Sequence, residues 1–323
     1  MPEAQLGNAP AHWIIRSAAG ASWACALALV VQPFAAGWLP PVTAFHQGRH
    51  LLLPLLLPLG LYLLHHRRRT AVPALLGFAF WLSFLPGWLR APEEFTEHSD
   101  LSVATANLAK LRSDATVVGD RLAEFDVDVI ALQEVDEPHC KALRARLGRQ
   151  YPYQVWYPTG LRGKALLSKH PVSSERFVPV ADGTCRLEVS LDVNGRELQV
   201  FNVHHRTKVS VMGRWLAGVR ELESALAARP DTPTLVLGDF NSVPGSWTLR
   251  GLEDLGLHNA DEGLGTDPGF TFPVPGRWRG WPWGPHYRID HVFHDANFEA
   301  LHAEVGPDLS SDHLPMVAYL KLR

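Results

Sequence analysis

A long stretch near the amino terminus carries no charge, and this strongly limits what that part of the chain can become. No charged residue lies between Arg16 and Arg49, and residues 17–39 offer 23 positions whose only strongly polar side chain is Gln32. About 20 consecutive apolar residues are enough for a helix to cross a bilayer. We therefore expect a membrane-spanning helix in this segment.

Two further apolar runs follow. The second run, residues 51–64, has only 14 uncharged residues, a length equally compatible with a re-entrant or interfacial segment unless residues from 42 onward extend it. The third run, residues 70–89, has 20 uncharged residues. A cleaved signal peptide fits poorly, because hydrophobic segments recur up to residue 89 without a convincing small-residue cleavage site. We expect residues 1–90 to be a membrane anchor with two to three transmembrane helices.

The basic segment 65–69 predicts the orientation of this anchor. Two histidines and three arginines lie between the second and third apolar runs, and basic loops stay on the cytoplasmic side. With three spans, the remainder of this integral protein of the plasma or inner membrane would be extracytoplasmic. This inference fails if residues 51–64 do not span, and Arg90 opposes it.

The rest of the chain has a different composition. Residues 96–323 hold 30 Asp and Glu against 24 Lys and Arg, so their net charge is 24 − 30 = −6. This balance argues against strong nonspecific binding to duplex nucleic acid, although a nuclease with a local basic patch remains compatible. Residues 91–100 read as a linker, and residues 101–323 as one globular domain.

Strand and helix patterns alternate beyond the linker. Ser113 is a candidate cap for one helix, and a second helix is expected at residues 212–228. Apolar runs predict strands at residues 101–106, 127–132, 165–168, 185–193, 198–203, 234–237, 289–293 and 315–320.

One of these strands ends in Gly238-Asp239-Phe240-Asn241. Alternation along an extended chain puts Asp239 and Asn241 on one side and turns Phe240 toward the core. A carboxylate can accept a proton from water, and an amide can orient that water or bond a phosphoryl oxygen, so the pair suits hydrolysis. A simple strand-ending turn is the alternative, because these residue types also favour turns.

The same arrangement recurs along the chain, which weakens the turn explanation. Other strands end at, or are preceded by, reactive polar groups: Asn107, Gln133 and Glu134, His204, Asp290, and Asp312 with His313. Turns alone do not readily explain so many reactive groups at strand ends.

These motifs, in this order, resemble those of the endonuclease/exonuclease/phosphatase superfamily, which shares its fold with DNase I. The resemblance covers the whole globular domain that follows the linker, and it implies a four-layer α/β sandwich, with two packed, mostly antiparallel sheets flanked by helices. It rests on Ala-Thr-Ala-Asn107, Leu-Gln-Glu134-Val, Asn-Val-His204, Gly-Asp239-Phe-Asn241, Arg-Ile-Asp290 and Ser-Asp312-His313.

The resemblance also implies a metal site. Glu134 would be the principal ligand of a catalytic Mg²⁺ or Mn²⁺, with Asn107 and Asp312 in or near the coordination sphere. Hard divalent cations prefer such oxygen ligands, and the metal would polarise the phosphoryl group and stabilise charge on the leaving oxygen.

Five other residues receive catalytic roles by the same resemblance. Asp239 is expected to be the general base for the attacking water, and Asn241 to orient that water or stabilise the transition state. His313 would contact a phosphate oxygen, with its ring orientation set by Asp290. His204 would lie on the leaving-group or phosphate side as an imidazolium that donates a proton or a hydrogen bond.

Several other residues leave alternatives open. His205, Arg206 and Lys208 could bind an anionic substrate or form a solvated basic loop, while His291 and His294 are expected to be structural. Cys140 and Cys185 could pair in an oxidising compartment, although two free thiols are favoured because no spacing pattern supports a disulfide framework.

The substrate is the least constrained property. Relatives cut DNA and RNA, shorten poly(A), dephosphorylate inositol lipids and hydrolyse sphingomyelin. Residues 275–283 hold three Trp and two Arg, which suit a membrane interface, nucleotide stacking or a buried aromatic cluster. With an anchor and no basic excess, a phospholipid or other membrane-proximal phosphoester is favoured. The alternatives are a membrane-tethered Mg²⁺-dependent nuclease and an inactive binding or sensor module, and no protein partner is inferred.

Overall fold

The computed structural model describes residues 9–35, 45, 48–49, 51–66, 68–82, 98–110, 113–205, 212–228, 232–261, 269–280, 282 and 284–323. The chain divides into two compact units, Met1–Trp88 and Leu89–Arg323. The end of the third apolar run, residues 83–89, and most of the linker expected at residues 91–100 lie outside the described residues.

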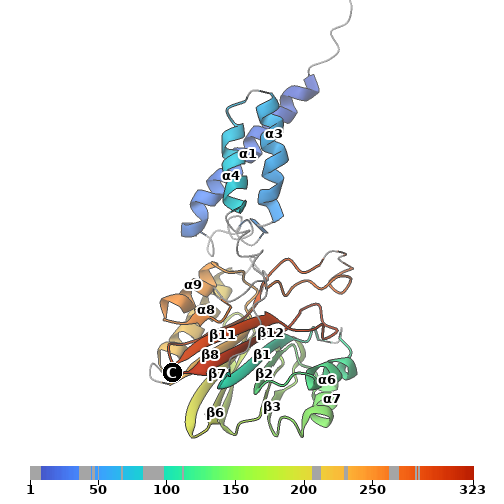
Figure 1. Cartoon of the computed structure of the whole chain (residues 1–323), viewed down its shortest axis with the longest axis vertical. Helices are drawn as coiled ribbons and strands as arrows, with labels where there is room; N and C mark the ends of the chain where they lie inside the picture. Colours follow the sequence, from blue (N-terminus) through green and yellow to red (C-terminus); the bar gives the residue numbers. More distant parts are fainter. Residues whose placement is uncertain are drawn as a thin grey trace, which may run out of the picture. The chain divides into compact units, whose positions relative to one another are not determined.

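The first unit is helical. It contains α1 (Ala9–Ala35), a 3₁₀ turn η1 (Leu53–Leu55), α3 (Leu56–His65) and α4 (Ala71–Leu82), which Figure 1 shows in blue to cyan. Within the described residues, only Trp13–Val31 is both long and apolar enough to cross a membrane. The shorter helices α3 and α4 have 10 and 12 residues.

Small residues let the helices of this unit pack closely. A Cβ on Gly60 would collide with Leu75, and one on Gly77 would collide with Leu56, so neither position tolerates a larger side chain without movement. Glycine at helix contacts is typical of association between apolar helices, where van der Waals packing stabilises the pair.

The second unit contains two six-stranded sheets, which we call sheet A and sheet B (Figure 1). Sheet A has the strand order β11-β12-β1-β2-β4-β3, and sheet B the order β5-β6-β7-β8-β10-β9. The β1–β2 and β7–β8 pairs are parallel, and the other pairs are antiparallel.

The strands of sheet A are β1 (Leu101–Asn107), β2 (Val129–Gln133), β3 (Tyr153–Tyr157), β4 (Lys164–Ser168), β11 (Phe298–Val305) and β12 (Met316–Leu322). Those of sheet B are β5 (Val172–Pro179), β6 (Cys185–Val193), β7 (Arg196–His204), β8 (Thr234–Asp239), β9 (His258–Asn259) and β10 (Asp290–His294). The α-helices that accompany them in the described part of this unit are α6 (Ala115–Ala123), α7 (Glu137–Leu147), α8 (Met212–Ala227) and α9 (Trp247–Asp254), together with the 3₁₀ turn η2 (Gly160–Arg162).

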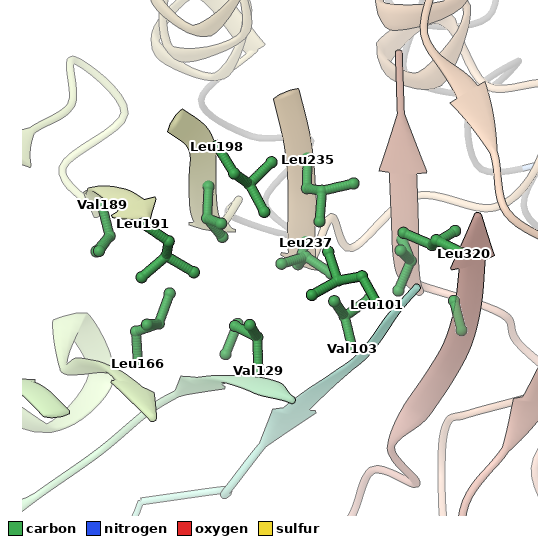
Figure 2. Packing of buried hydrophobic residues seen from close by; sticks show 14 of the residues in the cluster. Leu101, Val103, Val129, Leu166, Val189, Leu191, Leu198, Leu235, Leu237 and Leu320 are labelled. Carbon is green, nitrogen blue, oxygen red and sulfur yellow. The ribbon is translucent and has the colours of Figure 1, made fainter. Parts of the chain in front are cut away.

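Apolar clusters on both faces of each sheet hold these layers together. The largest lies between the sheets, where Leu101 and Val103 of β1 meet Leu235 and Leu237 of β8 (Figure 2). A second cluster packs α6 and α7 against sheet A, and a third packs α8 and α9 against sheet B. The predicted α/β sandwich of two packed sheets flanked by helices is therefore confirmed.

The alternation that buries this core also directs polar side chains into the gap between the sheets. Leu101 and Val103 share their face of β1 with Asn107, and Leu235 and Leu237 share theirs with Asp239. On β1 and β8, the face that points between the sheets therefore starts with apolar side chains and ends in a reactive polar side chain at the carboxyl end of the strand.

One local prediction is wrong, and several elements were not anticipated. Helix α6 is capped by Asp114, whose side chain accepts hydrogen bonds from the amides of Thr116 and Val117, whereas the Ser113 hydroxyl bonds elsewhere. The unpredicted elements are α7, α9, β3, β5, β9 and β11. Cys140 and Cys185 are buried free thiols, so the alternative disulfide does not form.

Candidate active site

Asp239 is the point at which the predicted residues converge. Its Oδ2 accepts a hydrogen bond from Asn107 Nδ2 at 2.9 Å, and it lies 3.5 Å from His204 Nε2 and 3.9 Å from His313 Nε2. Only 1% of Asp239 is exposed. Groups from β1, β7 and the segment before β12 therefore meet at the end of β8.

Sheet register places Asp239 in this position. Strand β8 pairs in parallel with β7, which sets Asp239 beside His204, and antiparallel with β10, which sets Asp239 beside Asp290. Gly238 has a φ of 149°, and a Cβ there would collide with the carbonyl oxygen of Val203. A side chain at this position would push β8 away from β7, so glycine is needed for the strands to pair up to Asp239.

Asn241 reaches the same carboxylate by a turn. Strand β8 ends at Asp239, and a left-handed residue, Asn241 with a φ of 49°, brings the chain back. Its backbone N–H donates to Asp239 Oδ1 at 2.8 Å, while its side-chain Nδ2 donates to Asp239 Oδ2 at 3.3 Å and to the carbonyl of His205 at 2.7 Å. Phe240 is buried against the α8 and α9 layer, as alternation predicted.

Glu134 follows β2 in another left-handed turn, with a φ of 54°. Its Oε1 lies 3.4 Å from Asn107 Nδ2, which donates a weak hydrogen bond, and 3.9 Å from His204 Nε2. The neighbouring Gln133 points between the sheets instead, where its Nε2 donates to Thr105 and Asn202, each at 2.9 Å. Gln133 thus ties the sheets together beneath the site, and Glu134 enters the site itself.

Asp290 and His313 form a buried pair beside Asp239. His313 Nδ1 lies 2.9 Å from Asp290 Oδ2, so the contact that we expected to orient the imidazole is present. Asp239, Asp290 and His313 each offer one atom that could bind a metal ion, and these three atoms all lie within 4.8 Å of one another. The three side chains are buried and therefore interact strongly.

This crowding sets the protonation of the pair. Burial opposes the charged imidazole of His313, but the nearby carboxylates of Asp290 and Asp239 outweigh it and raise the pKa of His313 to about 10. Burial, and then the charge of Asp290, raise the pKa of Asp239 to about 7. At neutral pH the arrangement favours a protonated His313 beside a carboxylate that can take up a proton.

The segment carrying Asp312 and His313 is fixed to the end of β1. Ser311 Oγ donates to the carbonyl of Asn107 at 2.6 Å and accepts from the backbone N–H of His313 at 3.1 Å. Asp312 is buried between these anchors, and its carbonyl accepts from the backbone N–H of Val274 at 2.9 Å. The Ser311 hydroxyl therefore ties the Asp312 segment to the end of β1, which carries Asn107.

The residues present fit a hard divalent cation. Glu134 and Asp312 offer carboxylate oxygens, the donors that Mg²⁺ and Mn²⁺ take. Asn107 offers its amide oxygen Oδ1, which also accepts from the backbone N–H of Ala109 at 2.9 Å, while its amide nitrogen faces Glu134 and Asp239. The raised pKa of Asp239 reflects its burial and its closeness to the carboxylate of Asp290. A divalent cation would offset this concentration of negative charge, so the donor set and the electrostatics agree.

His204 differs from its expected charge state. Burial, followed by the positive charges of Lys164 and His313, lowers the pKa of His204 well below its usual value. A neutral imidazole is therefore favoured at neutral pH, in place of the imidazolium that we expected. Such a ring can donate one hydrogen bond and accept another.

The residues flanking the site vary in position. His205 is buried, with Nδ1 3.8 Å from Asp182 Oδ2, so a solvated basic loop does not describe it. His291 is also buried, contacts Asn259 and the carbonyl of Ser242, and has a pKa lowered to about 3 by burial and Arg288. Arg206, Lys208, Trp281 and Trp283 lie outside the described residues.

An aromatic ring that was not predicted borders the site. The centroid of Phe272 lies 4.7 Å from that of His313, and Trp278 packs edge-on against Phe272 at 5.5 Å. Arg279 lies over the Trp278 ring. Trp278, in the described part of the loop 275–283, therefore packs against Phe272, which in turn contacts the ring of His313, a candidate catalytic residue. No spacing in the sequence indicated this contact.

A hydrogen-bonded chain that was not predicted joins the two turns that carry Asn107 and Glu134. Asp136 Oδ1 lies 2.7 Å from His139 Nδ1, and His139 Nε2 lies 2.9 Å from Ser113 Oγ. Ser113 Oγ also donates to the carbonyl of Leu108. We call these four residues the His139 clip. Ser113, His139 and Asp136 are the residue types of a serine hydrolase triad. The Ser113 hydroxyl, however, donates its proton to the backbone carbonyl of Leu108.

The chain was compared with known proteins. A model of the endonuclease/exonuclease/phosphatase family matches residues 104–313. Among curated proteins no match was found. Similar solved structures include an endonuclease/exonuclease/phosphatase from Beutenbergia cavernae, with 22% identity, a TM-score of 0.58, and coverage of 70% of this chain and 72% of that one.

Two eukaryotic structures are also similar in fold. Truncated Caenorhabditis elegans TDP2 is 16% identical, with a TM-score of 0.54 and coverage of 68% of this chain and 97% of that one. The human Nocturnin catalytic domain with bound sulfate is 18% identical, with a TM-score of 0.53 and coverage of 69% and 93%. At these identities the similarity establishes the fold.

Proposed function

The chain belongs to the endonuclease/exonuclease/phosphatase family, and from that premise we propose that it is a divalent-metal-dependent phosphoester hydrolase acting close to a membrane. The observation that carries this proposal is the convergence of Asn107, His204 and His313 on the buried carboxylate of Asp239. Members of the family are generally phosphoester hydrolases and typically depend on divalent metals.

Asp239 is the proposed general base. With a pKa near 7, it is poised to accept a proton from an attacking water at neutral pH. Asn241 holds the carboxylate through its backbone N–H and its side-chain amide, so the acceptor oxygens are fixed before substrate arrives. The two residues together would orient and deprotonate the water.

His313 is the proposed phosphate contact. Asp290 keeps its ring oriented and helps keep it protonated, so His313 can donate a charged hydrogen bond to a phosphoryl oxygen. His204 lies between Asp239 and Glu134 and would donate from a neutral ring on the leaving-group side. Asn107, Glu134 and Asp312 would hold Mg²⁺ or Mn²⁺, which when bound polarises the phosphoryl group.

The membrane part of the proposal rests on the first unit. Among the described residues, most of the exposed large apolar side chains belong to it, including Trp13, Trp23, Leu27, Leu55 and Leu76. A surface of this kind is unfavourable in water and suits a lipid environment. We assign residues 1–90 to a membrane anchor of two to three spans, 91–100 to a linker, and 101–323 to the catalytic domain, on the extracytoplasmic side.

We favour a phospholipid or other membrane-proximal phosphoester as substrate. The anchor restricts the domain to the neighbourhood of a bilayer, and the net charge of −6 over residues 96–323 disfavours binding to nucleic acid. A similar fold, the human Nocturnin catalytic domain, was solved with a bound sulfate anion, which supports a tetrahedral anion as ligand.

A parallel substrate screen tests the proposal. Full-length protein in detergent with Mg²⁺ would be offered phospholipid vesicles, single-stranded DNA and duplex DNA, and the release of phosphate groups or cleaved products measured. We expect activity on the vesicles that is lost in Asp239→Asn and kept in Asp254→Asn, an exposed control on α9. Digestion of nucleic acid alone would favour the nuclease alternative, and no activity on any phosphoester would favour a binding or sensor module.

A further inference from the structure

Lys164 is a buried cation to which the mechanism gives no role. It is the first residue of β4, and its exposed fraction is 0%. Its Nζ lies 3.5 Å from the carbonyl oxygen of Arg162, which is long for a hydrogen bond. Leu166, two residues further along β4, packs between the two sheets. Because side chains alternate along a strand, the Lys164 side chain lies on the same face of β4 and also points between the sheets.

The register of sheet A brings Lys164 beside the candidate metal site. Lys164 pairs with Gln133 of β2, the residue directly before Glu134. The negative charges that act on its ammonium are that of Cys185 first, followed by those of three carboxylates, Glu134, Asp239 and Asp182. Two of these three belong to the residues that we assign to metal binding and catalysis.

Keeping a charged ammonium at this buried position therefore lowers the stability of the folded protein. Burial lowers the pKa of Lys164 to about 8, yet the side chain stays mostly protonated at pH 7. A buried charge is unfavourable unless nearby charges compensate, and a methionine of similar length could fill the same space without that cost. A purely packing role does not require the charge.

We propose that Lys164 is a positioning residue that sets how tightly the Asn107, Glu134 and Asp312 site holds its divalent cation. This inference rests on the proposed function. The ammonium lies in the gap between the sheets on β4, whose neighbour β2 leads to Glu134, so its charge offsets part of the negative charge of Glu134 and Asp239 and repels a divalent cation at the site. The site thereby keeps its carboxylates together when no metal is bound and binds the metal less tightly than its acidic groups alone would.

Binding of Mn²⁺ to the full-length protein in detergent, measured by electron paramagnetic resonance of the free ion at pH 7, tests this inference without an activity assay. Lys164→Met is expected to lower the dissociation constant at least about tenfold, because a unit charge close to a divalent ion in a buried site has a large effect. Lys164→Arg keeps the charge and is expected to stay within about threefold of the parent.

Lys169→Met is the matched control. Lys169 follows the other end of β4, is partly exposed and pairs with Asp126 at 2.7 Å, so the same change in net charge occurs far from the gap between the sheets. Its Mn²⁺ affinity is expected to match that of the parent, because charges at the surface are screened.

An unchanged or weaker affinity in a folded Lys164→Met protein would overturn the inference while leaving the proposed function intact. Failure of the parent to bind Mn²⁺ would instead overturn the metal-dependent function itself. If circular dichroism shows that Lys164→Met is unfolded, Lys164→Gln, which is neutral and polar, is measured in its place against the same expectation.

Discussion

At the scale of single residues, the charge state of the site follows from how three buried groups share a small space. Asp239 and Asp290 lie opposite each other on paired strands, and the two carboxylates together keep His313 protonated. Burial and the charge of Asp290 raise the pKa of Asp239 to about 7. These contacts and charge states support the proposed roles of Asp239 as the general base and His313 as the protonated phosphate contact.

The first prediction concerns Asp239 itself. Asp239→Asn keeps the shape and can still accept a bond from Asn107, but it cannot take up the proton of the attacking water. We expect kcat to fall by about 10²–10⁴ with KM little changed. Steady-state kinetics on the substrate that the screen identifies measure this, and a fall of less than tenfold would remove Asp239 as the base.

The second prediction is a bell-shaped pH dependence. The base must be unprotonated, so activity should be lost as pH falls through about 7, and the cation must be protonated, so activity should be lost as pH rises through about 10. Asp290→Asn removes a charge that raises the pKa of Asp239, and should move the acid limb to lower pH. A profile of kcat/KM that is flat between pH 5 and 8 would contradict the assignment.

At the scale of secondary-structure elements, turns with left-handed residues aim the reactive groups. Glu134 has a positive φ directly after β2, and Asn241 has one two residues after the end of β8. The His139 clip fixes the turns that carry Asn107 and Glu134. Strand order alone would bring the strand ends together. These local hydrogen bonds decide where the side chains finally point.

A third prediction tests the clip. His139→Ala removes the two side-chain hydrogen bonds to Asp136 and Ser113, so the free energy of unfolding should fall by about 1–3 kcal/mol. Mn²⁺ affinity should also weaken, because both ligand-bearing turns lose a constraint. The exposed His258 provides the control, as His258→Ala should change neither quantity.

A fourth prediction concerns Gly238. Gly238→Ala would drive a Cβ into the Val203 carbonyl between β7 and β8, whereas Gly195→Ala places a Cβ in open space at a φ of 84°. Both changes carry backbone strain of about 1 kcal/mol or more, and only the first adds a collision. Chemical unfolding should show a loss at Gly238 at least about 2 kcal/mol larger, and equal losses would contradict the steric argument.

The sequence predicts elements well where alternation and polar ends coincide, and poorly where tertiary pairing decides. Strand β6 was predicted at its observed bounds, and β1 and β8 at their starts, because apolar residues alternate along β6 and β1 and form a continuous apolar run in β8. Strand β11 reads FEALHAEV, rich in residues that favour helices, and is extended because it pairs with β12.

The same distinction applies to the site. Asp239, Asp290 and His313 were identifiable from their strand ends and from the family's motifs. The buried position of Lys164 was not, because lysine in a sequence normally indicates a surface. Ser113 looked like a helix cap, and only the fold brings its hydroxyl to His139 and the carbonyl of Leu108.

At the scale of the whole molecule, an α/β sandwich and an apolar helical unit are joined in one chain. The exposed apolar side chains of the first unit and the helix segment Trp13–Val31 are the features that suit a bilayer. Within the second unit, the sheets meet through an apolar core, and the reactive groups lie at the strand ends beside it. Hydrolysis and membrane attachment would thus be separable properties.

A fifth prediction follows for topology. Two reporters fused after Arg323, one active only in the cytoplasm and one active only outside it, should show activity outside alone if three spans are present. Reporter activity in the cytoplasm would overturn the three-span arrangement while leaving the catalytic site unaffected. Removal of residues 1–97 should move the protein from the membrane fraction to the soluble fraction.

The central claim is that the groups around Asp239 form a metal-dependent phosphoester hydrolase. Its most direct test is hydrolysis of a chromogenic phosphodiester by full-length protein as Mg²⁺ is titrated, with Asp239→Asn measured in parallel. The account predicts product release that saturates with Mg²⁺, disappears with a chelator and falls at least about 10²-fold in the variant. Equal rates with and without Mg²⁺, or equal rates for parent and variant, would contradict it.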